Sequence, residues 1–195
     1  MNILKLCLDL LYPPRCPGCG AFVEEQGDWC STCFRSVWRP RMIGGSRNAY
    51  LDGCYTLGDY QGPLKKALLQ LKFAGNPVRE TSFAFLLSRF PWRERLEEPD
   101  LCVPVPLSEK RKTERGGNQT DLIFQKYMEQ MGKCYISALI RIRDTPPQHR
   151  LGRQERQKNL RMAFCVPCGE QIKDKKILLL DVMTLGLIQY WERCA

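Results

Sequence analysis

The stretch KKILLLDVMTLG, at residues 175–186, decides the fold that this sequence predicts. A short unbroken apolar run that ends in an acid is typical of a strand buried on both faces, and the Thr and Gly that follow predict a tight loop and the start of a helix. Ligands of open parallel sheets bind at the carboxyl ends of strands, where Asp181 lies. The free backbone N–H groups of a turn entering a helix can hold a phosphate, and a neighbouring acid suits sugar hydroxyls or a metal ion. The same pattern also occurs as plain α/β architecture, so it favours a ligand loop without proving one.

The size and composition of the chain describe a folded, basic protein. Its 195 residues can form one medium domain and a small one, and 44% apolar with 26% charged residues argue against wholesale disorder. The net charge of +9 indicates a polyanionic partner or a phosphorylated substrate, the alternative being a solvated basic surface. The apolar run at residues 3–11 contains Lys5 and Asp9, is too short to span a bilayer and lacks a signal-peptide cleavage site. We therefore expect a cytoplasmic protein without membrane insertion.

Two C-x-x-C motifs near the N-terminus predict a structural zinc site. Cys16 and Cys19 form the first motif, and Cys30 and Cys33 form the second after ten intervening residues. This spacing is typical of tetrahedral zinc ribbons, and four thiolates leave no open coordination position for chemistry. A redox pair of motifs or four unrelated buried cysteines are the alternatives. So short a segment cannot build its own core, so the metal would supply much of its folding free energy.

Prolines and a polar linker divide the chain near residue 45. The apolar positions of residues 4–11 lie on one face of a short helix that Pro13-Pro14 ends. Residues 39–48 are polar and contain a Gly-Gly pair, as linkers do. We expect a helix and a four-cysteine zinc ribbon over residues 1–45 and an α/β domain over residues 46–195.

Strand and helix patterns alternate beyond the linker. Residues 51–60 predict a strand and turn, residues 64–73 a packed amphipathic helix, and residues 101–106 a strand with an irregular end. A further helix ends at Pro91, and Asn118 can cap the helix that follows it.

Residues 108–117 are expected to form a basic loop between a strand end and a helix start. Anions bind in such places, so Lys110, Arg111 and Arg115 are candidate phosphate contacts. A solvated, mobile loop is the alternative.

Residues 141–161 carry seven basic and two acidic side chains, a net charge of +5. This clustering favours a nucleic-acid or phosphate-binding face over a bland surface, with a helix or flexible hood over residues 151–160. The cluster contains no aromatic residue, which argues against sequence-specific recognition of single strands. The candidate nucleic-acid contacts are Arg150, Arg153, Arg156 and Lys158.

The remaining reactive residue types show no catalytic pattern. Cys165 and Cys168 form a third C-x-x-C without a partner motif, so we expect two ordinary thiols. His149, the single histidine, has no companion base or nucleophile by spacing and is expected on the surface.

Several motifs in the same order resemble the ComF family of competence proteins, which are phosphoribosyltransferase-like and carry an N-terminal zinc ribbon. The resemblance covers nearly the whole chain. The matching motifs are LYPPRCPGC (11–19) with Cys30 and Cys33, Tyr60 and Gly62, LKFAG (71–75), VPVPL (103–107), Lys110-Arg111, ERG (114–116), Asn118-Gln119, Arg141, Arg143, Thr145, Pro147-Gln148, Leu151, Arg156, Asn159, Ala163-Phe164 and the Asp181 loop.

The resemblance implies a type I phosphoribosyltransferase-like fold, with a parallel sheet, helices on both faces and a flexible hood. It implies that phosphoribosyl pyrophosphate binds with Mg²⁺, its ribose hydroxyls at Asp181 and its 5′-phosphate at Thr184 and Gly186. The pyrophosphate would then meet Lys110, Arg111 and Arg115. The resemblance also implies a role in uptake of single-stranded DNA in natural transformation, with competence machinery proteins as partners.

The chain departs from the family at the sugar-phosphate loop. Leu180 stands where the family has a first acid, and Leu185 where it has a second threonine. Losing one charged acceptor contact costs about 1.5–3 kcal/mol, so we expect transferase activity to be reduced or absent. Few residues follow Gly186, so the sheet is expected to be C-terminally truncated and the domain incomplete.

These features predict a ComF-type protein of DNA uptake with a degenerate phosphoribosyl pyrophosphate loop. The alternatives are a zinc-containing single-stranded-DNA-binding module without enzymatic activity, and an inactive truncated product.

Overall fold

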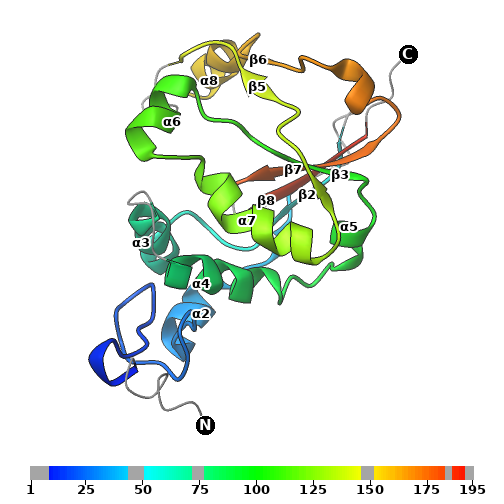
Figure 1. Cartoon of the computed structure of the whole chain (residues 1–195). Helices are drawn as coiled ribbons and strands as arrows, with labels where there is room; N and C mark the ends of the chain where they lie inside the picture. The colour runs from blue at the N-terminus through cyan, green and yellow to red at the C-terminus, as the bar shows by residue number, and fades with distance from the viewer. Residues whose placement is uncertain (1–8, 44–50, 72–76, 146–151, 183–185, 192–195) are drawn as a thin grey trace.

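A six-stranded sheet organises the chain, in the order β1-β2-β8-β7-β3-β4. The computed structural model describes residues 9–43, 51–71, 77–145, 152–182 and 186–191. In Figure 1 the sheet lies in the middle, the cysteine-rich N-terminal segment lies below it, and a two-stranded sheet with helix α8 lies above it.

The main sheet is mixed, with a parallel part. Strands β7, β3 and β4 run parallel, whereas β8 is antiparallel to both β7 and β2, and β1 is antiparallel to β2. The predicted α/β class is therefore confirmed, but the sheet is not parallel throughout. The strands are β1 Arg41–Met42, β2 Leu51–Thr56, β3 Leu101–Pro104, β4 Cys134–Tyr135, β7 Lys176–Asp181 and β8 Gly186–Trp191.

Strand β7 confirms the prediction of a strand buried on both faces. Leu178 and Leu180 belong to the large core, and Ile177 belongs to a second, smaller core with Leu101 and Val103 of β3. Successive side chains of a strand point to opposite faces, so this alternation places apolar packing on both sides of the sheet.

The helix predicted after Gly186 is wrong, because this segment is strand β8. Asp181 pairs with Gly186 and Lys176 pairs with Trp191, which makes β7 and β8 an antiparallel hairpin. The sequence GLIQYW is rich in apolar, β-branched and aromatic residues, which favour strands. Its position between β2 and β7 also gives both neighbours a hydrogen-bonded partner.

The helices follow most of the sequence predictions. The basic segment predicted as a loop is instead helix α6, which begins after Ser108 and ends at Gly116 in the left-handed conformation. Asn118 caps α7 as predicted, accepting from the Thr120 N–H. The remaining elements are α2 Ser31–Val37, α3 Gly62–Gln70, α4 Pro77–Leu87, α5 Glu94–Glu97, α6 Glu109–Arg115, α7 Gln119–Gln130, β5 Ile140–Arg141, α8 Arg153–Leu160, β6 Phe164–Cys165 and η2 Gly169–Gln171.

Helices α3, α4 and α7 supply the large core on one face of the sheet. Leu68 of α3, Phe83 of α4 and Phe124 of α7 are all buried and pack in one cluster with Leu178 and Leu180. Burying each of these side chains contributes about 1.5–3 kcal/mol relative to leaving it exposed. Among the described residues, no helix has the length and apolarity needed to cross a bilayer.

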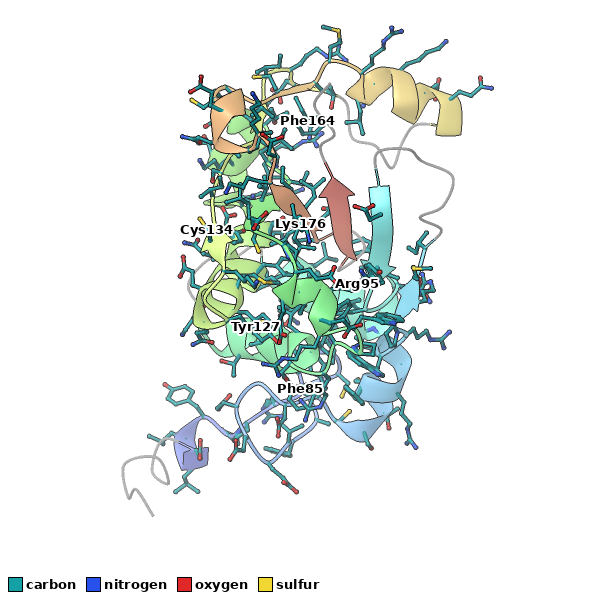
Figure 2. The ribbon with its side chains drawn as sticks, turned by 90° about the vertical axis from the view of Figure 1, so that its right-hand side faces the viewer. Phe85, Arg95, Tyr127, Cys134, Phe164 and Lys176 are labelled. Atoms are coloured by element: carbon teal, nitrogen blue, oxygen red, sulfur yellow. The ribbon has the colours of Figure 1, made fainter. Side chains whose placement is uncertain are left out.

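The N-terminal segment is attached to this same core through α4. The Trp29 indole N–H donates to the Ser82 carbonyl at 2.9 Å, and its ring lies edge-on to Phe83. Phe34 makes a second edge-on contact with Phe85, which Figure 2 shows at the end of the molecule opposite Phe164. The predicted domain boundary at residue 45 lies outside the described residues and stays a prediction.

Candidate metal centre and anion-binding site

Cys16, Cys19, Cys30 and Cys33 form one cluster. Their four sulfur atoms lie within 4.8 Å of one another, and the Cys19 and Cys30 sulfurs are 3.7 Å apart. A tetrahedral zinc ion with Zn–S bonds of about 2.3 Å requires sulfur–sulfur distances of about 3.8 Å. The donor set and its geometry therefore fit structural zinc, which would hold the segment in shape.

The two motifs take this geometry from their local backbone. The first turns back at Gly20, whose φ is +84° and whose N–H donates to the Cys16 carbonyl at 2.9 Å. In the second, the Cys30 sulfur caps helix α2 by accepting from the Cys33 N–H at 3.4 Å. A backbone N–H donated to sulfur favours the thiolate form that binds metal.

Gly18 is required by close approach. A Cβ atom there would lie 2.7 Å from Pro63 and 3.0 Å from the Cys33 sulfur. The first motif is thus pressed both against the second and against the start of α3.

The pKa values of two thiols in the cluster are shifted in opposite directions. Burial raises the pKa of Cys16, but backbone hydrogen bonds from Cys30, Cys19 and Gly18 outweigh it and lower that pKa to about 7. Burial raises the pKa of Cys33, and the hydrogen-bonded sulfurs of Cys19, Cys30 and Cys16 raise it further. A bound metal ion reverses this effect because it stabilises the thiolates. Cys165 and Cys168 do not belong to the cluster; Cys165 is half-buried in β6 and Cys168 is exposed.

A second site lies where the parallel strands end. Pro104 pairs with Leu180, and the Val105 N–H donates to the Leu180 carbonyl at 2.9 Å, so β3 and β7 end side by side. We call these strand ends, Asp181 and the connecting loop 105–108 the carboxyl edge. Asp181 therefore lies at the carboxyl end of its strand, as predicted, and is half-buried.

The phosphate seat predicted after Asp181 is not brought together on a helix. Gly186 lies in β8, opposite Asp181 in the hairpin, and Thr184 lies outside the described residues. Leu180 is completely buried in the large core. Assignment of the sugar-phosphate site to Asp181, Thr184 and Gly186 stays a prediction.

Loop 105–108 is held in place but contains an unsatisfied hydroxyl group. The Asn118 side chain donates to the Val105 carbonyl at 3.2 Å, which connects the loop to the start of α7. Ser108 is 3% exposed, and its Oγ has no hydrogen-bond partner within the described part of the chain. A buried hydroxyl without a partner costs about 1–3 kcal/mol, so a water or ligand oxygen beside it would be stabilised.

Arg111 of α6 and Arg141 of β5, the arginine pair, converge on Thr145. Arg111 donates to the Thr145 carbonyl at 3.0 Å, and Arg141 donates to the Thr145 hydroxyl. Burial and the nearby Arg111 charge lower the pKa of Arg141, and Asp144 offsets this only in part. Neither guanidinium forms an ion pair with a described carboxylate. Two partly buried cations without an ion-paired carboxylate favour binding of an anion.

The other predicted contacts lie on α6, on α8 or outside the described residues. Arg115 lies one turn beyond Arg111 on α6 and donates to Gln119, while Lys110 is exposed on the same helix. Lys158 is exposed on α8. Arg153 and Arg156 also lie in α8, but their side chains, like the whole of Arg150, are outside the described residues.

Arg141 and Thr145 were missed as individual site residues. The sequence placed them in or beside the basic cluster but carried no signal that they would contact Arg111, which is 34 positions from Thr145. A further arginine, Arg143, donates to the carbonyls of Asn159 and Arg161 and so connects β5 to α8.

Comparisons with known proteins give one family model for the cysteine-rich segment and several relatives over most of the chain. The double zinc ribbon domain matches residues 7–43. DNA utilization protein YhgH of Salmonella typhimurium is 31% identical over 196 residues, covering 94% of this chain and 84% of that protein. The protein of the same name from Escherichia coli K12 is 31% identical, covering 88% and 72%, and Competence protein F of Haemophilus influenzae is 25% identical, covering 89% and 74%. No solved structure matches this chain.

Proposed function

The chain belongs to the ComF family, and on that premise we propose that it is a DNA-handling protein whose arginine pair contacts the phosphates of single-stranded DNA. The names of its relatives support a role in DNA utilization or competence. The predicted cytoplasmic location and partnership with competence machinery proteins belong to the same proposal.

The observation that carries the proposal is the convergence of Arg111 and Arg141 on Thr145. A guanidinium group can offer parallel N–H donors to phosphate oxygens, and in the described residues no carboxylate forms an ion pair with either arginine. The exposed Lys158 on the neighbouring α8 extends the positive charge, with Arg150, Arg153 and Arg156 as further candidate contacts. A phosphodiester backbone can follow such a surface without recognition of its bases.

The hairpin of β7 and β8 supports a binding role without transferase chemistry. A phosphate seat requires free backbone N–H groups at the start of a helix, whereas the segment after Asp181 continues into a paired strand. Leu180 stands at the position where the family has its first acid, and its side chain is completely buried in the core, where it cannot contact a ligand.

A second candidate function is binding of phosphoribosyl pyrophosphate with Mg²⁺. The unsatisfied Ser108 hydroxyl at the carboxyl edge, near the strand end that carries Asp181, favours a small phosphorylated ligand there. Calorimetric titration of the full chain with this ligand and Mg²⁺ tests the candidate. The absence of heat at millimolar ligand would remove it and leave the DNA-binding proposal intact.

DNA binding is tested by fluorescence anisotropy with a labelled thymidine oligonucleotide over a range of salt concentrations. We expect affinity to fall steeply with salt, because each phosphate contact to a single strand contributes about 0.7 to the logarithmic slope. Replacing both Arg111 and Arg141 with Gln should make that slope shallower by about 1.4.

Arg95→Gln is the matched control, because Arg95 is already paired with Glu98 on the surface. It should leave the slope unchanged. A salt-independent affinity, or an unchanged slope in the Arg111→Gln/Arg141→Gln variant, would contradict the proposal.

A further inference from the structure

A groove of about 670 Å³ is lined by residues of the first cysteine motif, of the segment before it and of helix α3. We call it the ribbon groove. Its lining includes Tyr12 and Arg15 of the N-terminal segment and Lys66 and Gln70 of α3. Among the described residues that line it there are two cations and no carboxylate. Its volume is within the range of about 300–1,000 Å³ that is typical of ligand sites.

Two exposed aromatic rings lie at this end of the molecule. Tyr12 is 74% exposed and lines the groove, and Phe22 is 68% exposed and lies against Arg15. These are the large aromatic side chains with the greatest exposure in the described part of the chain. The other aromatic side chains that the structure describes are half-buried or buried. Large aromatic side chains are usually buried, so two highly exposed rings at one end of the molecule indicate a binding surface.

The rings are held in place by the same residues that line the groove. The Arg15 guanidinium lies 4.4 Å from the centre of the Phe22 ring and also donates to the Gly20 carbonyl at 3.1 Å. Gln26 donates to the Tyr12 carbonyl at 3.0 Å and so fixes the backbone there. Because the four clustered cysteines and the Trp29 contact with α4 hold this segment, the rings lie on a preorganised support.

Cationic grooves with aromatic rings are the general means by which proteins bind single-stranded nucleic acid. Bases stack on the rings, and the phosphates are neutralised by arginine and lysine. The arginine pair at the other end of the molecule has no comparable exposed ring among the described residues near it. The structure therefore places the exposed rings and the arginine pair in different parts of the molecule.

We propose that the ribbon groove is a base-stacking site for single-stranded DNA. Tyr12 and Phe22 stack on bases, and Arg15 and Lys66 contact the adjoining phosphates. This inference rests on the proposed function, since it assigns a second contact to the same strand. The cations in the groove and the charge of +9 favour a nucleic acid over an apolar peptide as its occupant.

The test compares full-length Tyr12→Ala and Phe22→Ala variants with the unmodified protein, using the same thymidine oligonucleotide. Loss of one stacked base is expected to weaken binding about 5- to 150-fold per ring. The salt slope should not change, because neither ring carries charge. The Tyr12→Phe variant keeps a ring and should bind like the unmodified protein.

Two controls separate stacking from other causes. An abasic oligonucleotide of equal length should bind the alanine variants and the unmodified protein equally, because it has no bases to stack. Leu10→Ala, at another exposed apolar residue of the same segment, should bind normally. Unchanged zinc content and thermal unfolding show that each variant is folded.

The outcomes distinguish this inference from the proposed function. Normal binding by both alanine variants, an equal loss on the abasic strand, or an equal loss in Leu10→Ala would overturn the stacking site while leaving the arginine pair as the DNA contact. If the unmodified protein does not bind the oligonucleotide at all, both proposals fail.

Discussion

The zinc-ribbon end (residues 9–43) and the carboxyl edge both begin from a recognisable motif, but the two motifs constrain the chain to different extents. Four cysteines within 18 residues bring their sulfurs together through local turns and a helix cap. At the carboxyl edge, the motif places Asp181 at a strand end, while the segment after it pairs with the preceding β7 and the distant β2 instead of starting a helix.

The difference shows what a motif can and cannot determine. A metal cluster depends on four ligand atoms that lie close in sequence, so few alternative structures satisfy it. A phosphate loop depends on the element that follows, and here a β-favouring segment completes the ladder between β2 and β7. Four predictions test this contrast, from the largest expected effect to the smallest.

Replacing Cys30 with Ser should have the largest effect. It removes one of four zinc ligands, and structural zinc contributes an apparent binding free energy of about 10–16 kcal/mol in small zinc domains. We expect loss of zinc by elemental analysis and a lower, broader thermal transition, because Cys16, Trp29 and Cys33 belong to the main core. Cys168→Ser is the control, since Cys168 is exposed and outside the cluster. Equal zinc content in both variants would exclude the metal centre.

Replacing Leu180 tests how strongly the core fixes the end of β7 at the carboxyl edge. Leu180→Ala should lower the free energy of unfolding by about 2–5 kcal/mol, because the side chain is completely buried. Leu180→Asp should cost more, because it also buries a carboxylate. Urea denaturation measures both effects. A stable Leu180→Asp variant that gains affinity for phosphoribosyl pyrophosphate would contradict the hairpin.

Tyr135→Phe tests the hydrogen-bond network that holds loop 105–108 of the carboxyl edge. The Tyr135 hydroxyl donates to Asp121 at 2.8 Å, and Asp121 also lies within hydrogen-bond reach of Asn118, which holds loop 105–108. Burial raises the pKa of Asp121, and the Tyr135 hydrogen bond and Lys112 lower it in part. Losing the donor should cost about 1.5 kcal/mol at neutral pH, the low end of the range for a charged acceptor, because the pair is only partly buried.

The sign of the pH dependence follows from the raised pKa of Asp121 in the folded state. The stability that this carboxyl group contributes is present at pH values below its unfolded pKa and is lost as pH rises through its folded pKa. The Tyr135→Phe variant raises that pKa further, so its cost should be greatest at neutral pH and shrink as the pH falls toward the unfolded pKa of about 4. Urea denaturation at both pH values measures it. Tyr127→Phe, which leaves Asp121 untouched, should show no such pH dependence.

The smallest effect is expected at a surface ion pair between β1 and the loop that follows β2. Arg41 of β1, shortly after the zinc-ribbon helix α2, pairs with the partly exposed Asp59. Exposed ion pairs contribute about 0–1 kcal/mol, so Arg41→Ala should shift the thermal midpoint by only a few degrees and lose even that at high salt. The exposed Arg39 gives the matched control in Arg39→Ala. A large, salt-independent loss would mean that Arg41 has a structural role beyond this pair.

Much of the architecture could be predicted from local patterns. The cysteine spacing, the apolar run of β7, the Asn118 cap and the helical stripe of α3 each depend on residues close in sequence, and each is present in the structure. The prediction of a loop at residues 109–115 was wrong because it rested on the high charge of this segment. These residue types are all compatible with a helix, and the left-handed Gly116 ends it.

By itself the sequence determined the zinc ligands, the buried strand and the family, because each of these depends on particular residue types at a fixed spacing. The tertiary structure alone decided that Arg111 and Arg141 converge on Thr145, that Lys66 and Arg15 line the same groove, and that Asp181 is followed by a strand paired with β2. These outcomes depend on contacts between residues tens of positions apart. The free energy of such contacts comes from packing and strand pairing of the whole chain, which no local pattern contains.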